Sequence, residues 1–288
     1  MGVLLALVSS LAWGSADFMG GVATRRVGAL RVLVISYPVG AVVITLAALF
    51  LVPGVLVART VAVGMVAGSV GAVAIGLLYA ALARGHMGVV SPITAVLSGA
   101  VPVTVGLVRG ERLTWLATAG ITVAAVAVIL VSREKRGAPR TTPPVALAYA
   151  FGSGLAIGTY VSILGTAPGD SGIWVTTVGR WFSSIVVACA LLVIVLARTR
   201  PSLRSGSNSR EHYPWLLVVI AGAFDAIANG VFQIAARNGV LVIVAVIGSL
   251  YPAATVILAR FLLHERLSRP QVLGVVLALF AAATLAVA

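Results

Sequence analysis

The chain has 288 residues, of which 60% are apolar and only 9% are charged, and its formal charge is +13. A soluble domain carries about 25% charged residues, and a soluble fold of this composition would expose large apolar patches and aggregate. This high apolar and low charged fraction excludes a soluble enzyme and a disordered or fibrous chain. The lone Cys189 excludes a disulfide framework and a Cys-based zinc site. The composition indicates a membrane protein.

Ten apolar runs follow one another along the chain, each long enough to be a transmembrane helix. A helix needs about 20 apolar residues to cross the hydrocarbon core of a bilayer, and such runs are too long for strands. The predicted spans are 2–21, 32–52, 60–82, 89–108, 115–132, 145–164, 172–197, 214–236, 240–262 and 270–287. The sequence therefore predicts an all-α integral membrane protein of about ten transmembrane helices, with no extramembrane domain for separate chemistry.

Two connections are longer than the others, 132–144 and 198–214, and both are polar and rich in turn-forming residues. The first falls near the middle of the chain and carries several basic residues. It predicts a division into a first five-helix repeat (1–132), a basic linker (133–144) and a second five-helix repeat (145–288).

The two halves share a spaced motif. Glu-Arg-Leu-Thr at 111–114 recurs as Glu-Arg-Leu-Ser at 265–268, an arginine precedes each glutamate by 27 or 28 residues, and a glycine follows each by 9. An internal duplication explains this spacing. Because each copy has an odd number of helices, the second enters the membrane from the opposite side. The result is an inverted repeat, which many secondary transporters use to alternate access around a central site.

Several short motifs resemble those of one transporter family: Trp-Gly at 13–14, Gly-Glu-Arg-Leu-Thr at 110–114, Ser-Leu-Tyr-Pro at 249–252, Ala-Arg at 259–260 and His-Glu-Arg-Leu-Ser at 264–268. Their order and spacing over both halves resemble the EamA-type branch of the drug/metabolite transporter superfamily. The resemblance implies a ten-helix carrier with a central cavity lined by its first, third, fourth, sixth, eighth and ninth helices. It also implies export of a small metabolite, whose identity it leaves open.

The basic residues are distributed unevenly between the two sides of the membrane. Odd-numbered loops hold fifteen of the twenty Lys and Arg residues, even-numbered loops hold four, and Arg180 lies within a span. The positive-inside rule places the odd loops in the cytoplasm and both termini outside. We expect a multi-pass protein of the cytoplasmic membrane in this orientation, although members of the resembled family are often described with both termini inside.

Three ionisable residues lie inside the spans: Asp17, Arg180 and Asp225. Such groups are costly in a membrane and are functional candidates by default. Asn229 and Gln233 follow Asp225 at i+4 and i+8, so these three side chains form a polar stripe on one helix face. The stripe predicts contact with the solute and a role for Asp225 in ion coupling; the alternative is a buried polar seam between helices. Asp17 is either a second ion-coupling group or an interfacial carboxylate.

Helix geometry predicts which of these charges meet. From one membrane face, Arg180 lies at about 12 Å, Asp225 at roughly 16 Å and Asp17 at roughly 22 Å. An Arg180–Asp225 pair is therefore expected before an Arg180–Asp17 pair. A paired Asp225 stays charged at rest, and a zwitterion such as an amino acid then replaces one member. An unpaired, buried Asp225 favours proton coupling instead.

Five further residues complete the set predicted to contact the solute: Trp13, Tyr79, Tyr160, Ser249 and Tyr251. Trp13 shares a helix face with Asp17, and the three tyrosines can form the floor of a cavity or anchor spans at the interface. Prolines in the fourth and ninth spans point to broken helices at corresponding positions, or to close packing.

The two recurring glutamates, Glu111 and Glu265, are predicted to be structural and interfacial. Each precedes a helix whose positive N-terminus favours a carboxylate. Ser268 and Gln271 fit a capping box at the start of the last helix.

The sequence argues against catalysis, so we expect no catalytic residue, metal or cofactor. The three histidines lie in loops without a metal-binding spacing, and the chain lacks a phosphate-binding loop for ATP. The prediction is a secondary transporter that exports a small organic metabolite (amino acid-like, nucleoside or drug-like cation) by alternating access. Its partners are the lipid bilayer, the solute and protons, not nucleic acid. A passive facilitator or channel is the alternative, and monomer and homodimer are both open.

Overall fold

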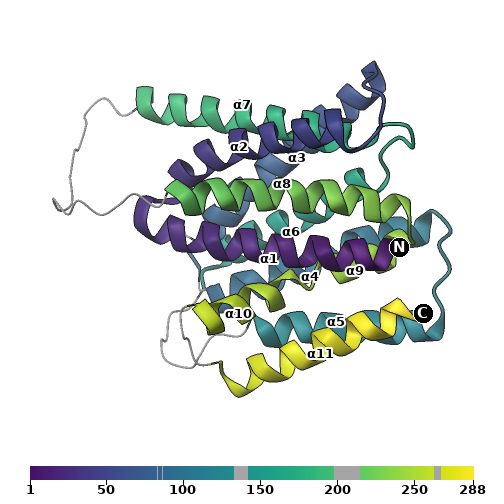
Figure 1. The fold of residues 1–288 in the computed structure, drawn as a ribbon. Helices are drawn as coiled ribbons and strands as arrows, with labels where there is room; N and C mark the ends of the chain where they lie inside the picture. Colours follow the sequence, from purple (N-terminus) through teal and green to yellow (C-terminus); the bar gives the residue numbers. More distant parts are fainter. Residues whose placement is uncertain (83, 86, 133–141, 198–214, 263–266) are drawn as a thin grey trace.

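The computed structural model describes residues 1–82, 84–85, 87–132, 142–197, 215–262 and 267–288, and their regular structure is entirely α-helical (Figure 1). The helices are α1 (Gly2–Val27), α2 (Ala29–Phe50), α3 (Ala58–Leu82), α4 (Met87–Val108), α5 (Trp115–Val131), α6 (Pro144–Gly165), α7 (Trp174–Ala197), α8 (Trp215–Arg237), α9 (Leu241–Gly248), α10 (Tyr251–Leu262) and α11 (Arg269–Ala286).

The ten predicted spans all coincide with helices. Eight segments are long and apolar enough to cross a membrane, among them Leu241–Leu262, which combines α9 and α10. Two shorter apolar segments, Ile93–Val108 and Trp115–Val131, complete the set. The fold is therefore that of an all-α, multi-pass membrane protein.

The main difference in boundaries lies at the first turn of the chain. The sequence predicts that the first helix ends at residue 21, but α1 continues to Val27, and α2 begins at Ala29 after the single residue Gly28. Gly28 has a φ of 86°, a conformation that glycine adopts without steric cost. Arg26 thus lies in the last turn of α1 rather than in a loop, where a cation interacts favourably with the helix C-terminus.

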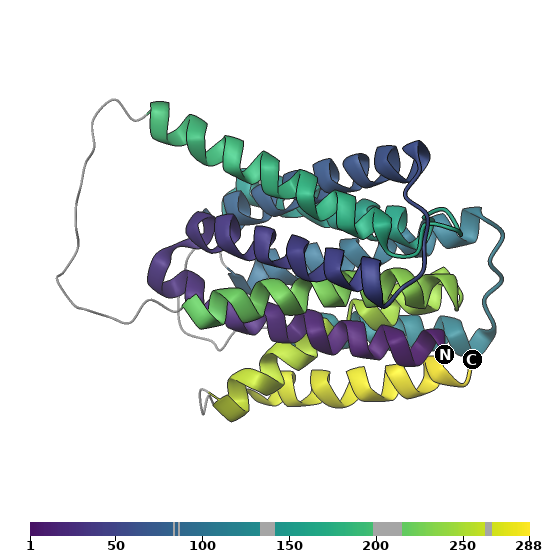
Figure 2. The ribbon, with the colours of Figure 1, turned by 45° about the horizontal axis from the view of Figure 1, so that its top comes forward.

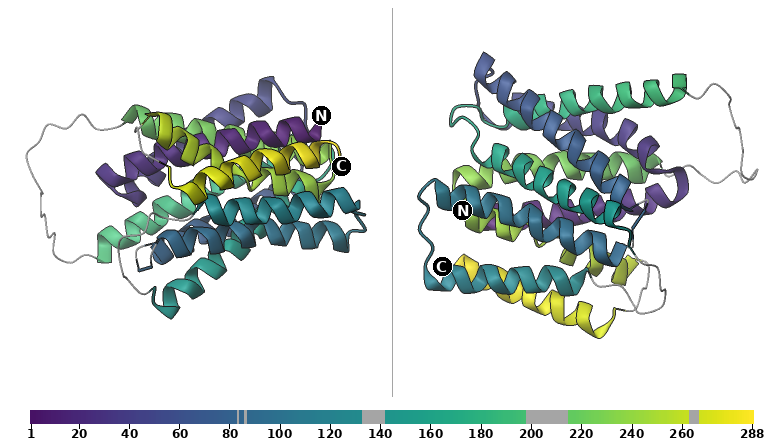
Figure 3. Two further views of the ribbon diagram at one scale, coloured as in Figure 1. Left: turned by 90° about the horizontal axis from the view of Figure 1, so that it is seen from below. Right: turned by 180° about the vertical axis from the view of Figure 1, so that it is seen from behind.

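The helices pack as one bundle, in which α8 contacts helices of both halves of the chain (Figures 1 and 2). α8 lies along α1 and α2, and α3 lies along α6 and α7. α4 packs against α6 and α9, while α5 and α11 pack together at one side of the bundle (Figure 3). Hence α1, α2, α6 and α7 all bring side chains to the centre around α8.

Small residues allow the closest helix contacts. A Cβ atom built on Gly68 of α3 would lie 2.5 Å from the carbonyl oxygen of Gly179 in α7, and Gly222 of α8 meets the backbone of Ser36 in α2. Helix association in membranes depends on such close packing, because lipid tails are as apolar as the helix surfaces.

One span is interrupted, between α9 and α10. α9 ends at Gly248, and Ser249 donates its hydroxyl to Val246 O (2.7 Å). Pro252 has no N–H to bond the carbonyl of Gly248, so one hydrogen bond of a regular helix is missing at this point. The prolines of the fourth span lie in the uninterrupted helix α4, so the predicted break occurs in only one of the two spans.

The two ends of the bundle differ in their packing. We call the end that holds both chain termini the terminal end (Figure 1). There, a Cβ on Gly2 would lie 2.9 Å from Asn238 O, and one on Gly54 would lie 2.7 Å from the backbone of Gly172. Toward the opposite end, the Cβ positions of Gly21 in α1 and Gly76 in α3 have no neighbouring atom within 4 Å. The open positions toward the opposite end are local to α1 and α3, because a Cβ on Gly274 of α11, also toward that end, would lie 2.6 Å from Val131 N of α5.

Candidate solute-binding site

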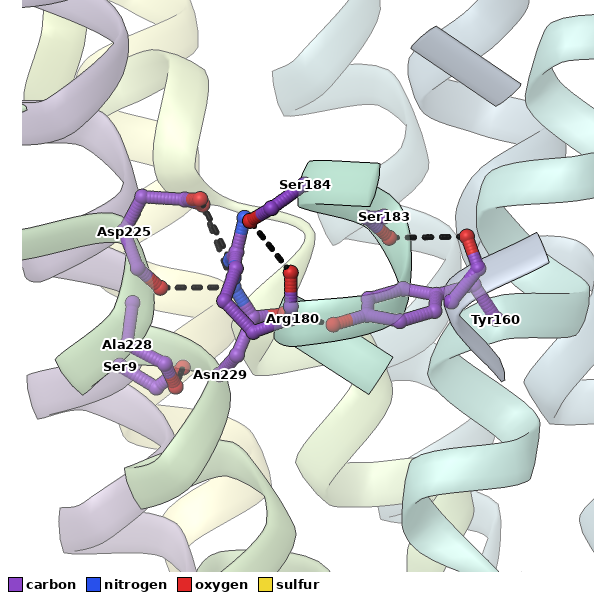
Figure 4. Close-up of polar contacts among 9 residues, drawn as sticks. Ser9, Tyr160, Arg180, Ser183, Ser184, Asp225, Ala228 and Asn229 are labelled. Carbon is purple, nitrogen blue, oxygen red and sulfur yellow. Dashed lines mark hydrogen bonds and ion pairs between the residues drawn. The ribbon is translucent and has the colours of Figure 1, made fainter. Parts of the chain in front are cut away.

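An ion pair joins α7 and α8 in the interior of the bundle. Arg180 Nη2 lies 2.5 Å from Asp225 Oδ2, which confirms the predicted pair (Figure 4). The Arg180 guanidinium also lies over the ring of Tyr37 in α2, with Cζ 5.0 Å from the ring centroid. A carboxylate on one side and an aromatic face on the other hold this cation in place.

The two members of the pair are buried to different extents. The Arg180 side chain is 7% exposed, whereas that of Asp225 is 33% exposed. Asp225 lies nine residues from Leu216, which places the two on opposite faces of α8, and Leu216 belongs to the outward face because it is 71% exposed. The exposed part of Asp225 therefore faces between the helices rather than toward lipid.

Asn229 and Tyr160 extend the pair to α6. Asn229 Nδ2 donates to both Asp225 O (2.6 Å) and Asp225 Oδ1 (3.2 Å), and Asn229 Oδ1 accepts from Tyr160 OH (3.0 Å) (Figure 4). Asn229 is buried and Tyr160 is partly buried. Three helices thus contribute to one connected polar network.

Asp17 lies on the inward face of α1, yet it is exposed to solvent. Helical periodicity places it on the same face as the buried Ala6 and Ser10 and as Trp13. Gly21, one turn further, is also exposed. The interior of the bundle is therefore accessible at the level of Asp17. Its inward-facing position favours a role in the interior over the alternative, a carboxylate at the membrane interface.

Asp17 lies near enough to the ion pair to interact with it electrostatically. Its carboxylate lies close enough to the carboxylate of Asp225 and to the phenol of Tyr251 to couple with both electrostatically. Within the described residues no hydrogen bond or salt bridge is formed by Asp17. Arg180 and Asp225 neutralise each other, and no cation among the described side chains forms an ion pair with Asp17.

Trp13 and Ser249 occupy packed positions beside this region. The Trp13 ring lies against Phe232, with centroids 5.4 Å apart, and it also contacts Gly248 at the end of α9. The hydroxyl of Ser249 donates a hydrogen bond to Val246 O, three residues earlier in the chain. Ser249 and Tyr251 are both partly buried.

Gln233 is fully buried, and its amide is already bonded. Its Oε1 accepts from Thr176 Oγ1 (2.6 Å) and Thr176 N (3.2 Å), and its Nε2 donates to Gly172 O (3.0 Å). Arg237 donates to the same carbonyl (3.1 Å). The polar stripe of α8 therefore divides: Asp225 and Asn229 lie in the ion-pair network, whereas Gln233 ties α8 to the α6–α7 connection.

Glu111 does lie at a helix N-terminus, but not at that of the following helix. The N-cap of α5 is Thr114, whose Oγ1 accepts from Ala117 N (3.1 Å). The Glu111 carboxylate instead accepts from the first N–H groups of α9, Leu241 N (2.9 Å) and Val242 N (3.0 Å). Spacing along the chain could not reveal this partner, which lies 130 residues away.

Two predicted residues cannot be placed. The side chain of Tyr79 and the whole of Glu265 lie outside the described residues. The capping box of Ser268 and Gln271 is present at the start of α11. Among the residues that the structure describes, no three His, Cys, Asp or Glu side chains gather as metal ligands.

Tyr37 is a site residue that the sequence analysis did not select. It is an aromatic residue within a predicted span, directly before Pro38, which was the available signal. Its position beneath Arg180 depends on how α2 is rotated against α7, which hydropathy does not determine.

A separate cavity of about 330 Å³ lies between α2, α3 and α7. Most of its lining is apolar, including Trp174, Trp181 and Phe182, and Trp181 Nε1 donates to Thr45 Oγ1 (3.0 Å). It offers no charged group, so the ion-pair network remains the candidate site for a polar solute.

Comparison with known proteins identifies the class. The sequence model of the EamA-like transporter family matches residues 144–287, half of the chain. The chain belongs to this family and is a membrane transporter of the drug/metabolite transporter superfamily. No curated protein matches it. A solved chain described only as the crystal structure of a protein shares the fold, with a TM-score of 0.74 and 19% identity over 98% of this chain and 95% of that chain.

Proposed function

We propose that this transporter is a secondary carrier that exports a small organic solute, with Arg180 and Asp225 at its binding site. The observation that carries the proposal is the unequal burial of the pair: Arg180 is held from two sides, while one third of Asp225 remains accessible from the interior. A purely structural pair has no reason to leave its carboxylate accessible. Charged groups at this depth mark substrate or ion pathways in membrane proteins.

The charges favour a zwitterionic solute such as an amino acid. A solute carboxylate can bind Arg180 in place of Asp225, and the solute ammonium group can bind the carboxylate that is released. Because Asp225 is already paired, Asp17 is the group left to bind a coupling proton. Asn229, Tyr160 and Tyr251 would orient the solute through their polar atoms.

The packing supports the division into two inverted repeats, 1–132 and 145–288. If α1 corresponds to α6 and α3 to α8, the contact of α1 with α8 has its counterpart in that of α6 with α3. The contact of α2 with α8 likewise corresponds to that of α7 with α3, and α5 pairs with α11, its own counterpart. Inverted repeats of this kind support alternating access by rocking of one repeat against the other.

The charge distribution orients the proposed carrier in the cytoplasmic membrane. The basic odd-numbered connections are expected at the end opposite the termini, so the positive-inside rule makes that end cytoplasmic. Asp17 is exposed and Asp225 is partly exposed in this conformation, as the loading of a solute requires.

The test is transport by purified protein in proteoliposomes that contain a trapped pH dye. Pools of amino acids, nucleosides and organic cations are added in turn. The proposal predicts that the amino acid pool elicits solute-dependent proton movement, and that Asp225→Asn reduces it at least tenfold because Arg180 loses its counter-ion. Asp170→Asn is the matched control, since Asp170 is exposed in the α6–α7 connection.

Full activity of Asp225→Asn would contradict the site. Solute movement without a proton signal would instead indicate a facilitator and would remove the proposed coupling role of Asp17.

A further inference from the structure

A carboxylate joins two distant connections at the terminal end. Gly110, with a φ of 88°, turns the chain after α4, and Glu111 then projects to the start of α9. Its two oxygens accept from Leu241 N (2.9 Å) and Val242 N (3.0 Å). The first N–H groups of a helix lack partners within the helix and carry partial positive charge, so a carboxylate satisfies both needs.

The structure also makes room for this carboxylate. A Cβ atom built on Gly106, two residues before the end of α4, would lie 2.5 Å from Glu111 Oε2 and would also collide with the side chain of Val242. The absence of a side chain at this position lets α4, the carboxylate and α9 meet closely. The contact is therefore supported by two residues of the first half of the chain.

α9 is a separate short helix that begins at the terminal end. Seven of its eight residues are buried, and it contacts α1, α4 and α8. The interruption at Ser249 and Leu250 separates it from α10. The half-helix can therefore shift without moving α10 as a rigid continuation.

We propose that Glu111 is the latch of the terminal gate. Its carboxylate holds the N-terminus of α9 while the terminal end is closed, and it releases the two N–H groups when that end opens. The inference rests on the alternating-access mechanism proposed above. A residue that caps its own helix would move with it, whereas Glu111 joins the α4–α5 connection to α9, two parts that must separate for solute to leave.

The test measures how accessible each end of the bundle is, by labelling with a hydrophilic maleimide in lipid nanodiscs. The background is Cys189→Ser, which removes the single native thiol. One reporter is Ala6→Cys, because Ala6 is fully buried in the same apolar cluster as Leu241 and Val244 of α9. The other is Gly21→Cys, on the same helix, where the Cβ position is open.

Glu111→Gln removes the charge but nearly preserves the shape. Only the closed state contains the charge-assisted hydrogen bonds of Glu111, so the variant destabilises that state alone. We therefore expect labelling at Ala6→Cys to accelerate about tenfold. Labelling at Gly21→Cys should slow, because the population shifts toward the conformation open at the other end. Asp170→Asn, a carboxylate-to-amide change at the same end, should alter neither rate.

Two results would overturn the proposal. Unchanged rates at both reporters would mean that Glu111 does not bias the conformation, and faster labelling at both would mean that it only stabilises the fold. If Glu111→Gln does not accumulate, Gly106→Ala replaces it, since the added methyl group displaces the same carboxylate and predicts the same opposite changes. The assay needs no solute, so failure of the proposed transport activity would be seen separately.

Discussion

At the scale of single residues, the network around Arg180 combines fixed and exchangeable contacts. Tyr37 fixes the cation through its ring, whereas Asp225 neutralises it through a carboxylate that remains partly accessible. Replacement of a carboxylate by a solute carboxylate needs little rearrangement of the cation. Asn229 holds Asp225 in position for this exchange, and Tyr160 in turn holds Asn229.

Tyr160→Phe tests whether Tyr160 positions Asn229, and through it Asp225. Without the hydroxyl, Asn229 Oδ1 loses its donor in a buried position, at a cost of about 1–3 kcal/mol. We expect the apparent Km for the solute to rise roughly tenfold while membrane insertion persists. Measured initial rates of solute transport across a concentration series provide the check.

Tyr149→Phe is the matched control on the same helix. Tyr149 presents its ring to Arg84, with 5.4 Å between Cζ and the centroid, and phenylalanine preserves that contact. Equal changes of Km in the two variants would show that Tyr160 does not act through Asn229.

Some of this site could be predicted from the sequence. Three charges within apolar spans stand out against their surroundings, and the constant rise of a helix places Arg180 level with Asp225. The roles of Tyr37 and Gln233 could not be predicted, because they depend on helix rotation. A one-residue rotation of 100° decides whether a side chain meets the ion pair or the neighbouring connection.

At the scale of helices, apolar length was sufficient to locate the spans but not their ends or partners. Hydropathy does not distinguish a basic helix end from a basic loop, so α1 extends beyond its predicted limit. A proline marks a possible interruption, but α4 accommodates its prolines and the α9–α10 span does not. The partner of Glu111 arises from the folding of the two halves together.

The contact between α3 and α7 gives a prediction about stability. Gly68→Ala places a methyl group 2.5 Å from the carbonyl oxygen of Gly179, and only movement of the backbone can relieve this overlap. Overpacking of this kind costs about 1–3 kcal/mol. We therefore expect a lower midpoint of thermal unfolding in detergent, measured by circular dichroism.

Gly76→Ala, on the same helix, is the control, because no atom lies within 4 Å of its Cβ position. This variant should match or slightly exceed the parent protein in stability, since alanine favours helix more than glycine does. A loss as large as that of Gly68→Ala would show that the effect comes from the backbone of α3 and not from its contact with α7.

At the scale of the whole molecule, polar contacts between connections at the terminal end and exposed residues in the interior link the structure to transport. Glu111, Gln233 and Arg237 tie connections together at the terminal end, whereas Asp17 and Gly21 remain exposed toward the other. The position of the spans along the chain follows from hydropathy. Which end is open is a property of one conformation, so no sequence pattern encodes it.

Alternating access makes a prediction that separates a carrier from a channel. A carrier must change conformation in each cycle, and a solute on the far side speeds its return, whereas a channel has no return step. The decisive measurement is the initial uptake of labelled solute into proteoliposomes with and without the same unlabelled solute trapped inside. We predict that internal solute increases the initial uptake several-fold, and that Asp225→Asn abolishes this increase. Uptake that is unaffected by internal solute would contradict alternating access around the Arg180–Asp225 pair.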